Sequence, residues 1–281
     1  VSPYVGAVDT AIMYSVVDIA GINSLSERIL GNAAAGVAGM AKRYARTTAS
    51  AAAGHELIGL TMFGLTTPAA DEAREVLTDA GYEVLVFHAT GAGGTAMEKL
   101  ASSGMLAGVC DLTTTELADD LVGGVLSAGP HRLEAAASAG VPQVVSVGAL
   151  DMVNFGPEET VPERFEGRNF VVHNPTVTLM RTTPEEMRTL GARIATKLRT
   201  ATSPATVYLP LGGVSGIDVE GGPFHDPAAD RACFDAIRAG LDGSGIEVVE
   251  LDQNVNDPGF GRAMAERLLA SIGHGSRTEP G

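Results

Sequence analysis

The stretch His88-Ala-Thr-Gly-Ala-Gly-Gly-Thr-Ala-Met-Glu-Lys-Leu100 decides the fold. It follows a short apolar segment, residues 82–87, that is typical of a buried strand. Apolar side chains then recur at helical spacing, and Gly104 offers a helix stop. A strand, a glycine-rich loop and a helix in this order bring backbone N–H groups and a helix N-terminus toward an anion. The alternative is a glycine-rich turn that only joins two elements.

The glycines of this loop favour the anion-binding interpretation. Glycine has no Cβ to keep the backbone away from a phosphate, and it tolerates positive φ. We therefore predict that Gly91, Gly93, Gly94 and Thr95 bind phosphate through their backbone amides. A β-branched side chain at Gly93 is expected to block that approach and to leave the fold intact.

The spacing of the loop also fits a dinucleotide fingerprint. Gly91-x-Gly93-x-x-Ala96 matches the pattern, and Asp111 follows about 20 residues later at a strand end, as the motif expects. The match supports a nucleotide, but it does not separate ATP from NAD, because both present a ribose and phosphates.

Composition limits the classes of partner. The chain has 281 residues, and 45% of them are hydrophobic. Its net charge of −15 argues against nucleic acid and against an anionic membrane surface as partners. No apolar run reaches the length of a membrane span. The two cysteines, Cys110 and Cys233, stand in apolar contexts without metal or redox spacing, which predicts core thiols in a reducing cytoplasm.

Alternating apolar strands and amphipathic helices predict the fold class. They indicate an α/β domain over residues 54–273, built on a doubly wound, mainly parallel, Rossmann-like sheet, with a flexible tail over residues 274–281. The predicted strands cover residues 57–63, 82–87, 106–110, 143–147, 207–211 and 246–251. The connection after residue 148 is too long for an ordinary loop, and we expect it to be functional or to form a lid.

Residues 1–48 are predicted to be the closing segment of a second, N-terminal α/β subdomain whose main body is absent from this chain. A helix over residues 26–46 is rich in Ala and Gly, which permits close approach of another backbone. We therefore expect it to be buried in a homo-oligomer or against the missing N-terminal part.

Polar segments follow nearly every predicted strand. In a parallel sheet these segments meet at the carboxyl edge, where ligands bind. Thr113, Thr114 and Thr115 would add hydroxyl or amide donors, and Asp111 a ribose or metal contact. Gly148 and Asp151 follow the next strand, and Asp111, Glu116 and Asp151 are candidate Mg²⁺ ligands. Helix capping is the alternative role for each of these residues taken singly.

Two histidines are the candidates for acid–base chemistry. His88 stands beside the glycine loop, and His225 stands in a Gly- and Pro-rich loop. His173 is a weaker third candidate. A structural role is the alternative for each of them.

Several motifs together resemble a known family, the ATP-binding domain of the tobamovirus-resistance protein of tomato and its bacterial relatives. The resemblance spans nearly the whole chain. It is carried by residues 88–98, by Asp111-Leu-Thr-Thr-Thr-Glu-Leu-Ala-Asp119, by Ser146-Val-Gly-Ala-Leu-Asp-Met-Val-Asn-Phe-Gly156, by Leu179-Met-Arg-Thr-Thr183, by Gly213-Val-Ser-Gly-Ile-Asp218 with Phe224-His-Asp-Pro227, and by Ser15-Val-Val-Asp-Ile-Ala-Gly-Ile-Asn23. It implies a two-part architecture and ATP binding by the glycine loop and the threonine run, without implying a reaction.

Three hypotheses follow for the function. The first is a cytoplasmic protein that binds ATP, with or without Mg²⁺. The second is an enzyme that uses NAD or a phosphorylated metabolite, with His88 or His225 as its acid–base group. The third is a non-catalytic interaction module in which the nucleotide stabilises an assembly. ATP turnover would separate the third hypothesis from the first two.

Overall fold

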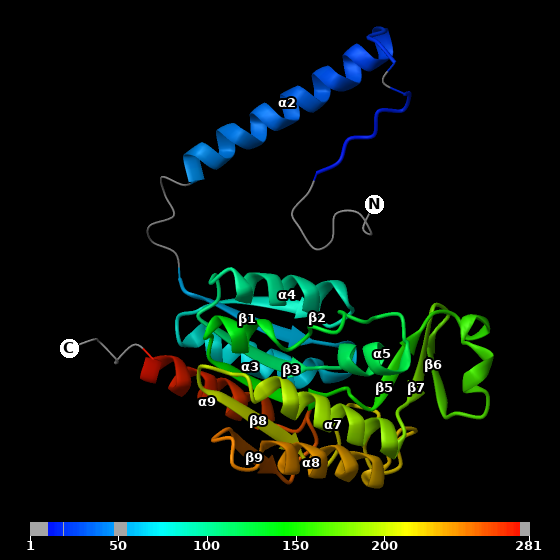
Figure 1. The fold of residues 1–281 in the computed structure, drawn as a ribbon, viewed down its shortest axis with the longest axis vertical. Helices are drawn as coiled ribbons and strands as arrows, with labels where there is room; N and C mark the ends of the chain where they lie inside the picture. The colour runs from blue at the N-terminus through cyan, green and yellow to red at the C-terminus, as the bar shows by residue number, and fades with distance from the viewer. Residues whose placement is uncertain (1–10, 19, 48–54, 276–281) are drawn as a thin grey trace. The chain divides into compact units, whose positions relative to one another are not determined.

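Six parallel strands form the central sheet of residues 56–281. The structure, a computed structural model, describes residues 11–18, 20–47 and 55–275. The strands lie in the order β2 (Glu83–His88), β1 (Leu57–Met62), β3 (Gly108–Thr113), β4 (Gln143–Gly148), β8 (Ala205–Pro210) and β9 (Glu247–Leu251) (Figure 1). All neighbouring pairs are parallel, which confirms the predicted doubly wound, Rossmann-like α/β fold.

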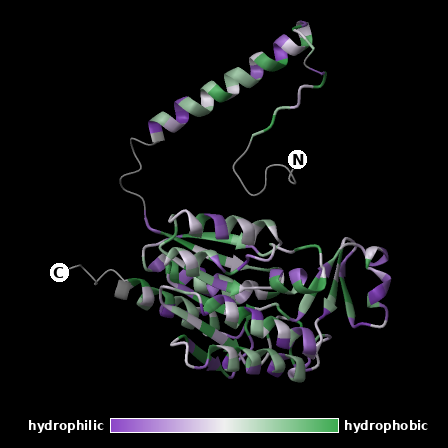
Figure 2. Cartoon of the chain, in the orientation of Figure 1, coloured by the Kyte–Doolittle hydropathy of each residue, from purple (hydrophilic) through white to green (hydrophobic). Residues whose placement is uncertain are grey.

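Helices cover both faces of this sheet. One face carries α3 (Thr67–Asp79) and α9 (Phe260–Gly275). The opposite face carries α4 (Ala92–Ser102), α6 (Ala135–Ala139), α7 (Pro184–Leu198) and α8 (Pro227–Leu241), with α5 (Glu116–Val122) beside α7. The two central strands β3 and β4 are therefore buried along their whole length, and hydrophobic residues run along the strands (Figure 2).

The order of the strands defines a topological switch point. From β1 the chain first adds β2 on one side and then crosses over to add β3 on the other side. In doubly wound sheets of this order, the ligand crevice lies outside the carboxyl ends of the first and third strands. The loops after β1 and β3 are thus the places where a ligand site is expected.

A second, antiparallel sheet lies within the long connection between β4 and α7. Its strands are β5 (Met152–Phe155), β7 (Val177–Arg181) and β6 (Phe170–Asn174), in that order, with short 3-10 turns η3 (Glu158–Thr160) and η4 (Glu163–Phe165) between β5 and β6. None of these three strands was predicted from the sequence. The side chains of Met152 and Leu179 pack with Phe63 after β1, so this small sheet covers the carboxyl edge of the large one.

Helix ends follow the expected local chemistry. The hydroxyl of Thr183 accepts a hydrogen bond from the Glu186 amide, and the Glu186 carboxylate accepts one from the Thr183 amide, forming a capping box at the start of α7. Asp226 caps α8 by accepting hydrogen bonds from the amides of Ala228 and Ala229. Cys110 and Cys233 are both buried and free, as predicted for core thiols.

Residues 1–55 form a separate unit, and its described part contains the long helix α2 (Ser24–Thr47). Leu30, Val37 and Met40 on this helix are exposed. The predicted tail is partly helical, since α9 continues to Gly275, and residues 276–281 lie outside the described part of the chain. Across the described ranges, no helix has both the length and the apolar character needed to cross a bilayer.

The contact between α7 and α8 depends on a glycine. A Cβ atom at Gly191 would overlap the carbonyl oxygen of Cys233 on α8. We expect Gly191→Ala to lower the free energy of unfolding by about 1–3 kcal/mol, because two packed helices would have to separate. The control is Gly36→Ala in α2, where an added Cβ meets nothing within 4 Å. Urea unfolding of both variants tests this, and an unchanged midpoint for Gly191→Ala would contradict the packing.

Candidate functional site

The segments that follow the strands meet at the carboxyl edge. The Thr114 amide donates to the Gly148 carbonyl at 3.0 Å, and the Ala149 amide donates to the Val214 carbonyl at 2.8 Å. The Ser215 hydroxyl donates to Asp151 Oδ2 at 2.7 Å. Segments after β3, β4 and β8 are thus in direct contact, and the polar side chains among them are buried.

The glycine loop meets an anion that belongs to the chain itself. The amides of Gly91 and Gly94 both donate to Glu116 Oε1, at 2.6 and 3.0 Å. Glu116 is fully buried and approaches the N-terminus of α4, where a phosphate is favoured in other proteins. Phosphate binding by Gly91, Gly93, Gly94 and Thr95 stays a prediction, and for two of these amides it requires displacement of Glu116.

The expectation that Gly93 tolerates a β-branched side chain is wrong. A Cβ atom there would overlap the carbonyl oxygen of His88. A side chain at Gly93 therefore disturbs the turn from β2 into α4, and loss of binding in such a variant would not identify a phosphate contact.

The threonine run is turned inward. Thr113, Thr114 and Thr115 are each 0% exposed. Thr113 Oγ1 pairs with Thr66 Oγ1 at 2.7 Å, across the switch point between β1 and β3. The Thr114 hydroxyl donates to the Ser146 carbonyl, and the Thr115 hydroxyl donates to the Met152 carbonyl. These hydroxyls join the segments of the edge, and their role as ligand donors stays a prediction.

A fully buried guanidinium is the centre of the first ionic cluster. Arg132 donates to both oxygens of Asp111 at 2.5 and 2.7 Å, to Glu116 at 2.7 Å and to Glu98 at 3.1 Å. Asp111 also accepts a hydrogen bond from the Thr61 hydroxyl. Burial alone would lower the pKa of Arg132, but the charges of the neighbouring carboxylates raise it above its ordinary value.

The carboxylates of this cluster are saturated by donors. Glu98 accepts hydrogen bonds from the amides of Leu133, Glu134 and Ala135 at the start of α6. Glu116 holds the start of α4 in the same manner, so two helix N-termini share the negative charge that one arginine cannot balance. Asp111 is paired with Arg132 rather than left open for a ribose or a metal.

A second ionic cluster lies at the ends of β4, β7 and β8. Arg181 donates to Asp230 at 2.7 Å and lies 3.8 Å from Asp218 Oδ1, and it also donates to the Phe224 carbonyl. One oxygen of Asp151 and one of Asp218 are buried without a hydrogen-bond partner. Three buried carboxylates therefore surround one cation.

This excess of negative charge shifts proton binding. Burial, together with the charge of Asp218, raises the pKa of Asp151 to about 7 and that of Asp230 to about 8, although Arg181 opposes both shifts. A proton on such a carboxyl relieves the repulsion in the cluster, because like charges in a low dielectric cannot all remain ionised.

A cavity opens at the carboxyl ends of β1 and β2. Its volume is about 310 Å³, and we call it the edge cavity. Its lining comes from the loops after β1 and β2, from Leu126 and from the β6–β7 hairpin: Phe63, Gly64, Leu65, His88, Thr90, Leu126, His173, Asn174, Val177 and Leu179. The walls are apolar, and the polar groups come from two histidines, one threonine and one asparagine.

The two candidate histidines occupy different places. His88 lines the edge cavity, and its ring lies 5.5 Å from the Phe63 ring, centroid to centroid. His225 stands at the second cluster, with Nδ1 4.0 Å from Asp218 Oδ1. His173 also lines the edge cavity. Two of the three candidate histidines therefore lie at one site.

Two buried arginines that organise the clusters were not predicted from the sequence. Arg132 and Arg181 stand in ordinary contexts, and spacing does not show which charged side chains are buried. Among the described residues, no group of three His, Cys, Asp or Glu side chains is arranged to hold a metal ion. The proposed Mg²⁺ contacts of Asp111, Glu116 and Asp151 stay predictions.

Comparison with known proteins identifies the family. Residues 55–272 match the C-terminal domain of an uncharacterised protein family, UPF0261, and residues 1–46 match its N-terminal domain. The chain belongs to the UPF0261 family. The family membership that the motifs indicated is thereby confirmed, and the ATP binding that the resemblance implies stays a prediction.

Relatives within UPF0261 are similar over almost the whole chain. A UPF0261 protein of Clostridium tetani is 53% identical over 267 residues, which cover 95% of this chain and 65% of that protein. One of Rhizobium meliloti is 52% identical over 94% of this chain and 65% of the relative. The ToMV resistance protein Tm-1(GCR237) of Solanum lycopersicum is 44% identical over 95% of this chain and 36% of its own length. The chain thus spans about two thirds or less of these relatives.

One solved structure gives a weaker match. The periplasmic ribose ABC transporter of Conexibacter woesei is 15% identical, with a TM-score of 0.24 over 71% of this chain and 54% of that one. A score this low carries no argument about fold or function.

Removal of the central guanidinium tests the first cluster. We expect Arg132→Met to destabilise the protein by about 3–5 kcal/mol, because Asp111, Glu116 and Glu98 would keep buried charges without a cation. The control is Arg238→Met, whose pairs are exposed and whose loss should cost less than about 1 kcal/mol. Equal urea midpoints for the two variants would contradict the buried network.

The second cluster predicts a pH dependence. Because the folded pKa of Asp230 lies above its unfolded value, the folded protein keeps a proton that the unfolded chain has lost between about pH 4 and about pH 8. This contribution is fully present below that window and is lost as pH rises through it. Asp230→Asn removes the titration and keeps an acceptor for Arg181, so the free energy of unfolding should fall less steeply with pH than in the wild type. If the free energy of unfolding fell equally steeply with pH in both proteins, Asp230 would not carry this proton.

Proposed function

We propose that this UPF0261 protein binds a nucleotide, with ATP as the first candidate, in the edge cavity. The observation that carries the proposal is the position of this cavity at the carboxyl edge of the sheet, where the loops after β1 and β2 contribute Phe63, Gly64 and His88 to its lining. Ligands of doubly wound sheets bind at such an edge. The proposal moves the site from the glycine loop to the neighbouring loop after β1.

The chemistry of the cavity suits the base and part of the ribose. At about 310 Å³ it lies at the lower end of ligand pockets, so the phosphates of ATP would extend beyond it. Phe63, Val177 and Leu179 offer apolar contact to a planar base. His88 and His173 offer ring nitrogens that can donate to or accept from its polar edge.

The N-terminus of a helix close to the cavity would attract the phosphates. Gly64 and Leu65 line the cavity, and the turn Gly64–Thr66 leads directly into α3. The N-terminus of α3 attracts negative charge, whereas the N-terminus of α4 already holds Glu116. The phosphates of a bound nucleotide are therefore proposed to lie toward the start of α3.

Two other functions remain as alternative proposals. His88 in the cavity favours an enzyme in which it acts as acid or base on NAD or a phosphorylated metabolite. The exposed apolar residues of α2 favour an interaction module that is completed by a second copy or by more of the N-terminal domain, which the match over residues 1–46 supports. A cytoplasmic location is part of the first proposal.

Matched histidine variants test ATP binding. We expect His88→Ala and His173→Ala each to weaken ATP binding roughly fivefold, the effect of one lost hydrogen bond. His55→Ala is the control, because this exposed histidine does not line the cavity. Isothermal titration with ATP and with NAD measures the effect. Binding that is unchanged in both cavity variants would refute the proposed site, and tighter binding of NAD would favour the second function.

A variant with a smaller edge cavity complements this test. An added Cβ at Gly64 meets nothing within 4 Å, so Gly64→Val should fold like the wild type while it occupies cavity volume. Loss of ATP binding with an unchanged melting temperature supports the edge cavity. Unchanged affinity argues against it.

A further inference from the structure

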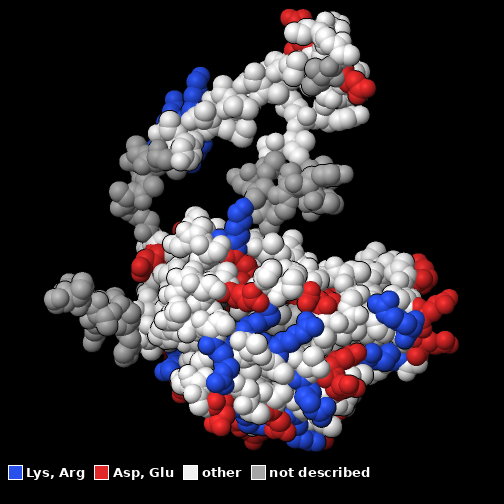
Figure 3. All heavy atoms as spheres, in the orientation of Figure 1, with Lys and Arg blue, Asp and Glu red and all other residues white. Residues whose placement is uncertain are grey.

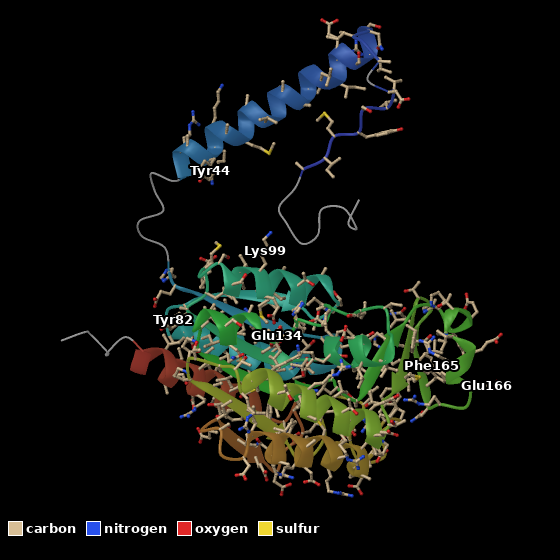
Figure 4. All side chains as sticks on the ribbon, viewed as in Figure 1. Tyr44, Tyr82, Lys99, Glu134, Phe165 and Glu166 are labelled. Atoms are coloured by element: carbon tan, nitrogen blue, oxygen red, sulfur yellow. The ribbon has the colours of Figure 1, made fainter. Side chains whose placement is uncertain are left out.

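The connection between β5 and β6 is a crossover. Both strands pair antiparallel with β7, so they run parallel to each other, and the chain must return along the length of the small sheet as well as pass β7. Residues 156–169 make this crossover as an excursion with the two short turns η3 and η4. Figure 4 shows Phe165 and Glu166 on this excursion, at the end of the domain formed by β5, β6 and β7.

The excursion encloses a groove of about 400 Å³. Its apolar surface comes from Val161, Pro162, Phe165 and Phe170. Phe165 is 7% exposed, and its ring lies 5.3 Å from the Phe155 ring, centroid to centroid, so the floor is anchored in the main core. The groove is therefore a fixed part of the fold.

The rim of this groove is acidic. Glu158, Glu163 and Glu166 line it, and all three are exposed. None of them forms an ion pair with another described residue, and no lysine or arginine is part of the lining. Figure 3 shows acidic side chains at the outer edge of this end of the domain, with basic side chains beside them. We call this feature the acidic groove.

Both arginines of the excursion have partners within the chain. Arg168 pairs with Glu186 at the start of α7 and donates to the Arg181 carbonyl. The Arg164 guanidinium lies 4.5 Å from the centroid of the Phe165 ring, and that of Arg168 lies 6.0 Å from it. These contacts show that the aromatic floor accepts a guanidinium, as expected from the negative face of the ring.

We propose that the acidic groove binds a basic segment of a partner polypeptide, with a Lys or Arg head group at the three carboxylates and an apolar side chain on Phe165 and Phe170. Charge complementarity selects this occupant, because the rim would repel a phosphate, an acidic peptide or a nucleic acid. The long stems of Lys and Arg also cover apolar surface while their charges stay in water. None of the groove residues lines the edge cavity, so this surface is independent of the proposed nucleotide site.

The test compares two variants that lose the same charge. One carries Glu158→Gln, Glu163→Gln and Glu166→Gln in the groove. The control carries Asp71→Asn, Glu75→Gln and Asp79→Asn on exposed positions of α3. The probe is a short fluorescein-labelled peptide of alternating Lys and Leu, and a peptide with Glu in place of Lys is the negative control. Fluorescence anisotropy with the full chain measures the affinity, and circular dichroism checks the fold of each variant.

We expect the groove variant to bind the Lys-Leu peptide roughly tenfold more weakly than the wild type, and the α3 control to bind it normally. Affinity should fall as NaCl is raised from about 50 to about 300 mM. Equal losses in both variants would show non-specific charge attraction and overturn the proposal, as would absence of binding to the wild type. Displacement of the peptide by spermidine at equal concentration would assign the groove to small organic cations instead. Self-association that only the groove variant abolishes would assign it to a second copy of the chain.

Discussion

The buried guanidinium of Arg132 is the constraint on which the carboxyl edge depends. It joins the end of β3 through Asp111, the start of α5 through Glu116, and α4 through Glu98. One cation cannot neutralise three carboxylates in a low dielectric, so the remaining charge is shared with the amides that begin α4 and α6. The positions of two helices on one face of the sheet are therefore fixed by a single network of charge-assisted hydrogen bonds.

This network explains why the glycine loop is not an open phosphate cradle. A P-loop or dinucleotide loop leaves its amides free for an external anion. Here the chain supplies the anion itself, as the Glu116 carboxylate, and a Cβ at Gly94 would overlap that carboxylate. The internal network requires these glycines. The same sequence pattern is therefore compatible with internal packing and with ligand binding. The edge cavity lies between the loops after β1 and β2 and the β6–β7 hairpin, and no side chain of this network lines it.

The sequence predicted the large sheet closely, because its strands are short apolar runs bounded by polar or glycine-rich segments. The predicted segment 143–147, for example, differs from β4 (Gln143–Gly148) by one residue. The small sheet escaped prediction because β5 has four residues and its partner β7 follows far along the chain. The sequence predicted which segments meet at the carboxyl edge, but it did not predict the contacts among them. Periodicity shows which segments reach the edge, but it does not show that Glu116 turns inward or that Arg132 and Arg181 are buried.

A crystal structure with a non-hydrolysable ATP analogue would test the central claim most directly. The account predicts the base between Phe63 and the β6–β7 hairpin, beside His88 and His173, with Glu116 still bonded to the amides of Gly91 and Gly94. Phosphates bound to those two amides, with Glu116 displaced from the start of α4, would contradict it and restore the glycine loop as the site.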